Sequence, residues 1–212
     1  MAVVIAPCTL LETWRREATM LGFECVDRAQ ETGGGGSRPL LVLASWAKIP
    51  TPAEIMRRRG RSCEDRSVCE YAVICDEAHA MQSLRSQRTR DALALCSHQC
   101  CSGVILATGT PMKNGRPSNI FPLLLAVRHP LSQHRISFET RYCAAKRTKF
   151  CPWDTSGASN LQELQEKIRP VLIRKTKVKV PLVVQYHIVC MCMSQPGRCV
   201  ACRSMRTLTY VW

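Results

Sequence analysis

The chain has 212 residues, of which 46% are hydrophobic and 22% charged, a composition typical of a globular protein large enough for a full core. No apolar stretch reaches the roughly 18 residues that a membrane span requires, and the apolar start lacks a preceding basic region, so we expect no membrane helix and no secretory signal. Thirty Lys and Arg against 16 Asp and Glu give a formal net charge of +14. This excess favours a polyanionic partner, with nucleic acid as the first candidate and an anionic membrane surface as the weaker one.

Short apolar runs alternate with helical patterns along the first half of the chain. Thr9 precedes Leu10-Leu11-Glu12, a capping-box pattern, and a helix with Leu11, Trp14, Ala18 and Leu21 on one face is expected after it. A second helix is expected over residues 91–98, a loop over 31–39 and a polar excursion over 52–67. Buried strands are predicted at four places: residues 2–6, 40–45, 71–75 and 103–108.

The expected strands are rich in β-branched residues and do not alternate between apolar and polar positions. Strands of this kind, separated by helices, predict an α/β fold with a parallel sheet covered by helices on both faces. In such a fold ligands lie at the carboxyl edge of the sheet.

From residue 121 onward the pattern becomes helical, and after Pro181 it has no clear period. We therefore expect a domain over residues 1–180 and a divergent tail over 181–212. The tail contains a Cys-x-x-Cys, and a zinc site is an alternative interpretation of its four cysteines: Cys190, Cys192, Cys199 and Cys202.

Acidic side chains follow the third apolar run directly, in the sequence YAVICDEAHA (71–80). An Asp at a strand end can hold Mg²⁺ through water, and the adjacent Glu can orient or deprotonate an attacking water. Asp76 is thus the candidate magnesium residue, and Glu77 is the candidate catalytic residue. The alternative is that both acids only cap the next helix.

The fourth strand runs into LATGTPMKNG (106–115). This motif places the hydroxyls of Thr108 and Thr110 on either side of Gly109, at the same sheet edge as Asp76 if the two strands are neighbours. Alone, the motif is equally compatible with a simple turn.

Together, VVIAPCTLLETWRRE, LLVLASW, YAVICDEAH, LATGTPMKNGRPSNIFPLL and IRPVLIRKTK resemble the first RecA-like lobe of Swi/Snf-related ATPases of helicase superfamily two, in order and near the family's spacing. The stretch 138–164, FETRYCAAKRTKFCPWDTSGASNLQEL, resembles the annealing-helicase, HARP-like branch. The resemblance implies an ATP- and magnesium-dependent nuclear motor that tracks on double-stranded DNA and remodels it at stalled forks.

The resemblance also assigns roles to single residues. It places Asp76 and Glu77 at the magnesium and hydrolysis positions, and His79 at a position that couples two lobes. Thr108, Gly109 and Thr110 match the motif that links hydrolysis to DNA movement.

DNA-backbone contacts are implied for two further segments, one with Pro7, Thr9 and Leu10 and one with Ser45 and Trp46. Basic residues of the 138–164 stretch are candidates as well, although a solvated basic face is an equally ordinary explanation. These are Arg141, Lys146, Arg147 and Lys149, and the run Arg174, Lys175, Lys177 and Lys179 follows them.

A phosphate loop of the form G-x-x-x-x-G-K-[ST] occurs nowhere in the 212 residues. The resemblance also ends before a second RecA-like lobe. We therefore expect an incomplete lobe, truncated at both ends, with little ATP turnover of its own. The alternative function is a non-catalytic DNA-binding or regulatory fragment of the same fold.

Overall fold

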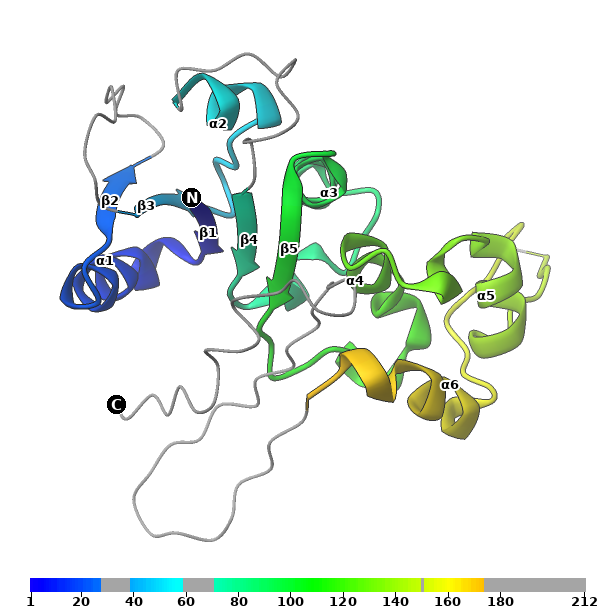
Figure 1. Cartoon of the computed structure of the whole chain (residues 1–212). Coiled ribbons are helices and arrows are strands. Elements are labelled where there is room, and N and C mark those ends of the chain that lie inside the picture. Colours follow the sequence, from blue (N-terminus) through cyan, green and yellow to red (C-terminus); the bar gives the residue numbers. More distant parts are fainter. Residues whose placement is uncertain (28–38, 59–70, 150, 174–212) are drawn as a thin grey trace, which may run out of the picture.

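A computed structural model describes residues 1–27, 39–58, 71–149 and 151–173 of the chain. Within these ranges a five-stranded sheet forms in the order β2-β3-β1-β4-β5, and every strand pair is parallel (Figure 1). The strands are β1 (Ala2–Ala6), β2 (Glu24–Asp27), β3 (Leu40–Ser45), β4 (Tyr71–Cys75) and β5 (Cys101–Leu106). The prediction of a parallel α/β sheet is confirmed.

Helices cover both faces of the sheet. Val3 and Ile5 of β1 pack into the larger apolar cluster, which the helices after β3 complete, whereas Val4 and Ala6 belong to a smaller cluster under α1. The helices are α1 (Leu11–Met20), α2 (Pro52–Arg58), α3 (Gln87–Ser97), α4 (Phe121–Ala126), α5 (Arg135–Tyr142) and α6 (Leu161–Ile168). No helix in the described part of the chain has the length and apolar character to cross a bilayer.

The start of α1 differs from the prediction. Thr9 lies inside a short 3-10 turn, Cys8–Leu10, and no side chain caps the helix that follows it. Leu21, expected on the packed face, is 66% exposed because the helix ends at Met20. The capping-box assignment at Thr9 was therefore wrong.

A true capping box begins α2 inside the segment expected to be a polar excursion. The backbone N–H of Thr51 donates to Glu54 Oε2 at 2.7 Å, and the Glu54 N–H donates to Thr51 Oγ1 at 3.2 Å. Ile55 and Met56 then pack into the core. Residues 31–38 and 59–67 of the two expected loops lie outside the described residues.

Candidate functional site

Asp76 lies directly after β4, and hydrogen bonds engage both its main chain and its carboxylate. Its N–H donates to the carbonyl of Ile5 in β1 at 2.8 Å, which extends the sheet by one step. Its Oδ1 accepts from the Glu77 N–H, and its Oδ2 accepts from the indole Nε1 of Trp14, both at 2.9 Å. Its carbonyl accepts from the indole of Trp46, also at 2.9 Å. The carboxylate is thus fixed in one orientation.

Glu77 occupies the left-handed region, with φ 49° and ψ 48°. This conformation strains a residue with a Cβ. The turn brings Glu77 Oε2 to 3.0 Å from Nδ1 of His79, and both side chains remain partly exposed. Asp76 and Glu77 therefore do not act as simple caps: no side-chain cap bond precedes the 3-10 turn Ala78–Met81.

The Thr-Gly-Thr motif lies beside this turn because β4 and β5 are neighbours, with Cys75 opposite Leu106. The N–H of Ala78 donates to the Ala107 carbonyl at 2.8 Å and joins the two strand ends. Thr108 is buried, and its Oγ1 accepts from the Thr110 N–H at 3.1 Å, whereas Gly109 and Thr110 are exposed. The predicted placement at one sheet edge is confirmed.

Gln82 adds a side-chain link between the two motifs that the sequence did not reveal. Its Nε2 donates to the carbonyls of Thr110 and Pro111, at 2.7 and 3.1 Å. A glutamine that follows a strand at this distance carries no sequence signal for this contact. The segment after Asp76 and the Thr-Gly-Thr loop thus form one hydrogen-bonded unit.

The donor set suits a hydrated magnesium ion better than a naked one. No group of three or more His, Cys, Asp or Glu side chains gathers into a metal cage within the described residues. Each oxygen of Asp76 accepts one N–H and keeps a further lone pair. Since Mg²⁺ retains several waters and takes phosphate oxygens as ligands, Asp76 fits a water-mediated hold.

The two segments expected to contact DNA lie next to Asp76. Pro7 and Leu10 are half-buried and Thr9 is exposed, whereas Ser45 is half-buried. Trp46 is only 8% exposed, and its indole is committed to Asp76. A direct DNA contact by the Trp46 ring is therefore disfavoured, because the ring belongs to the core.

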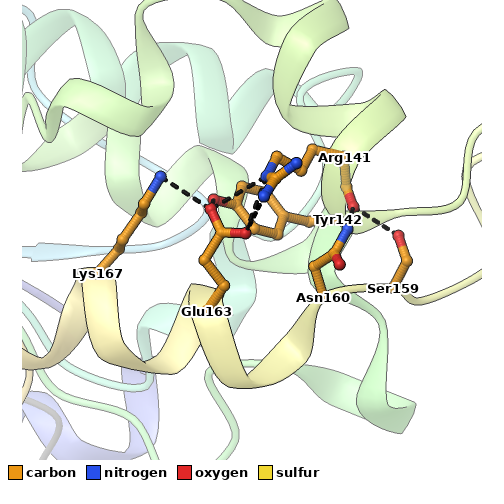
Figure 2. Close-up of polar contacts among 6 residues, drawn as sticks. All are labelled: Arg141, Tyr142, Ser159, Asn160, Glu163 and Lys167. Atoms are coloured by element: carbon orange, nitrogen blue, oxygen red, sulfur yellow. Dashed lines mark hydrogen bonds and ion pairs between the residues drawn. The ribbon is translucent and has the colours of Figure 1, made fainter.

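Arg141, another expected DNA contact, is engaged within the chain (Figure 2). Its Nε lies 3.0 and 2.9 Å from the two carboxylate oxygens of Glu163, and its Nη2 also bonds this carboxylate. Tyr142 donates its hydroxyl to Glu163 at 2.9 Å, and Lys167 lies 2.8 Å away. Hydrogen bonds from Arg141, then Lys167 and Tyr142, lower the pKa of Glu163 to about 2. DNA would have to compete with Glu163 for this guanidinium.

The stretch between α5 and α6 is fastened to α5. Ser159 Oγ and Asn160 Nδ2 donate to the Arg141 carbonyl at 2.6 and 2.8 Å (Figure 2). The indole of Trp153 donates to Glu139 Oε2 at 2.7 Å. These bonds hold the stretch that carries the remaining basic candidates against α5.

Lys146 and Asp154 pair as an antiparallel bridge, and the Thr148 N–H donates to the Cys151 carbonyl at 2.9 Å. Arg147 and Lys149, which follow Lys146, are exposed to solvent. Within the described ranges neither of these two side chains forms an ion pair, unlike Arg141. Arg174, Lys175, Lys177 and Lys179, with the tail cysteines, lie outside the described residues.

Comparisons with known proteins agree with this arrangement. Residues 41–196 match the family model described as the SNF2-related domain. Over 106 residues the chain is 38% identical to the bovine SWI/SNF-related matrix-associated actin-dependent regulator of chromatin subfamily A-like protein 1, covering 50% of the chain and 11% of that protein. It is 36% identical over 111 residues to the human DNA annealing helicase and endonuclease ZRANB3, covering 51% of the chain and 10% of that protein.

The chain thus spans about a tenth of the length of the curated relatives that it matches. A solved structure, the Sulfolobus solfataricus SWI2/SNF2 ATPase core in complex with dsDNA, superposes with a TM-score of 0.52 at 18% identity. That match covers 82% of this chain and 33% of the other. At this identity the likeness concerns the fold.

Proposed function

Because the chain belongs to the SNF2-related domain family, we propose that it is part of an ATP-driven motor that moves on double-stranded or forked DNA, of the annealing-helicase type. The observation that carries the proposal is the meeting of Asp76 and Glu77 with the Thr108–Thr110 loop at one sheet edge. The relative named as a DNA annealing helicase supports the type of motor. Replication-fork repair in the nucleus is the setting proposed with it.

The nucleotide chemistry is assigned to the end of β4. Magnesium-bound ATP would supply the phosphoryl group for transfer to water. Asp76 would hold the hydrated metal, and Glu77 would orient the attacking water and accept its proton. His79 lies 3.0 Å from the Glu77 carboxylate and restrains its rotation. Asp76 and Glu77 keep separate roles because each has its own hydrogen-bond partners.

Movement of DNA is assigned to the neighbouring loop and the basic surface. Gln82 binds the carbonyl of Thr110, so a shift of the segment after Glu77 reaches the Thr-Gly-Thr loop directly. Pro7, Thr9, Leu10 and Ser45 face the DNA backbone in this proposal, and Arg147 and Lys149 add phosphate contacts. Contacts of this kind bind without sequence preference.

A second function is favoured by one observation: the 212 residues contain no G-x-x-x-x-G-K-[ST] loop to cradle the phosphates. A fragment without this loop can bind DNA or regulate a motor without turning over ATP. The proposed basic surface serves either function equally well.

ATP hydrolysis by the 212-residue chain, measured with and without forked duplex DNA, separates the two functions. DNA-stimulated turnover that Glu77→Gln abolishes supports the motor and excludes the non-catalytic fragment. Salt-dependent DNA binding without turnover in the wild type supports the non-catalytic fragment for this chain. Gln82→Ala is a useful companion variant, because it spares Asp76 and Glu77 and cuts only the link to the Thr-Gly-Thr loop.

A further inference from the structure

Two tryptophans from different segments converge on Asp76. Trp14 of α1 reaches the carboxylate across a sequence separation of 62 residues, and Trp46, just after β3, reaches the carbonyl across 30. An indole has one N–H donor and no acceptor, so each ring donates its single hydrogen bond to the same residue. Trp46 follows Ser45 directly, and Trp14 lies about one helical turn after Leu10; Ser45 and Leu10 are both proposed DNA contacts.

We propose that Trp14 is a positioning residue that couples DNA contact at the start of α1 to the orientation of the Asp76 carboxylate. The inference rests on the proposed function and deepens it, because it names the side chain through which bound DNA acts on the nucleotide site. Trp46 acts differently, since its bond to the main-chain carbonyl fixes the end of β4 and leaves the carboxylate alone.

The path from DNA to the carboxylate is short. Trp14 lies in the first turn of α1, which begins at Leu11 directly after the 3-10 turn Cys8–Leu10. An α-helix rises about 1.5 Å per residue, so Trp14 lies within about one helical turn of the 3-10 turn. A displacement of the start of α1 by a phosphate contact would therefore move the residue that donates to Asp76.

The orientation of the Asp76 carboxylate depends on the Trp14 bond. Oδ1 is tied to the adjacent Glu77 N–H, so Oδ2 is the oxygen whose position a distant element controls. Trp14 is half-buried and packs beside the small cluster under α1, with Leu11 and Phe23. A packing role alone needs only the ring, whereas coupling needs the N–H, and Trp14→Phe separates the two.

Indole ¹⁵N–¹H NMR spectra of the 212-residue chain test the coupling directly, because the sequence holds only four tryptophans. Trp14→Phe and Trp153→Phe assign the signals. In Asp76→Ala and Asp76→Asn the Trp14 signal is expected to move from its wild-type position, whereas the Trp153 signal, bound to Glu139, stays. An unmoved Trp14 signal in both variants overturns the bond.

Duplex DNA is then titrated into the wild type. Coupling predicts a saturable shift of the Trp14 signal, reduced in Asp76→Ala, and a smaller stimulation of ATP turnover in Trp14→Phe at saturating DNA. Backbone signals that shift while the Trp14 signal stays overturn the coupling and leave the proposed DNA binding intact. Absence of any shift, with no binding, overturns both the inference and the proposed function.

Discussion

Replacing Trp153 with Phe is expected to loosen the stretch that carries Arg147 and Lys149. The indole donates to Glu139 Oε2 at 2.7 Å, and the other oxygen of this carboxylate accepts from Arg135 at 2.6 Å. The Glu139 side chain is 8% exposed, so water replaces a lost donor poorly. Phe keeps most of the ring and removes only the N–H.

A net hydrogen bond to a charged group contributes about 1.5–3 kcal/mol. Trp153 is 37% exposed, and water reaching its side of the bond places the expected loss at the lower limit, about 1.5 kcal/mol. In a chain of this size that loss lowers Tm by about 3–6 °C.

Thermal unfolding followed by circular dichroism measures the change, with Glu139→Gln as the matched background. Because hydrogen bonds to ionised groups are about twice as strong as neutral ones, Trp153→Phe is expected to cost about half as much in that background. Equal Tm values for wild type and Trp153→Phe would refute the reasoning. An equal loss in both backgrounds would show that packing, not the charge-assisted bond, holds the stretch.

Three further predictions concern charge and strain. Arg147→Ala is expected to reduce the slope of log affinity against log salt for duplex binding, measured by fluorescence anisotropy, by about 1. Arg141→Ala should change this slope less, because Arg141 is already paired with Glu163. A larger effect of Arg141→Ala would contradict the assignment. The pKa of Glu163 is lowered from its ordinary 4.5 to about 2, so wild type should exceed Glu163→Gln in unfolding free energy by its full margin above pH 4.5, and this difference should vanish as pH falls towards 2. Glu166→Gln controls for the loss of a carboxylate from α6. A difference that widens in acid would contradict the prediction. Glu77→Gly should raise the free energy of unfolding in urea by about 1 kcal/mol, because glycine relieves the strain of the left-handed conformation. The variant also loses the proposed catalytic carboxylate. A destabilised variant would mean that the contact with His79 contributes more than the strain costs.

The sequence predicts the central strands well because their apolar runs have no competing interpretation. β1, β3 and β4 are confirmed at the predicted bounds. The edge strand β2 escapes prediction because Val26 is its only buried residue, so the strand lacks an apolar run. At α2 the Thr51-x-x-Glu54 pattern was present in the sequence, and the basic residues after it obscured the signal.

The contacts of the candidate site likewise include some that the sequence predicts and some that it does not. Strand-end motifs are local, so the meeting of Glu77 with the Thr108 loop follows once β4 and β5 are paired. The bond from Trp14 to Asp76 spans 62 residues, and the pairing of Arg141 with Glu163 spans 22. Such contacts depend on how helices pack on the sheet, and no spacing rule encodes them. A buried indole usually requires a partner, however, and this rule identifies Trp46 as a side chain to examine, whereas the half-buried Trp14 gives a weaker signal.

Both proposed functions require this basic α/β domain to bind the DNA backbone, and binding of a labelled duplex over a range of salt concentrations tests that requirement. We expect binding by the 212-residue chain that is equal for unrelated sequences, with the logarithm of the affinity falling linearly as the logarithm of salt rises. Binding that ignores salt, or no binding to duplex or forked DNA at low salt, would contradict it.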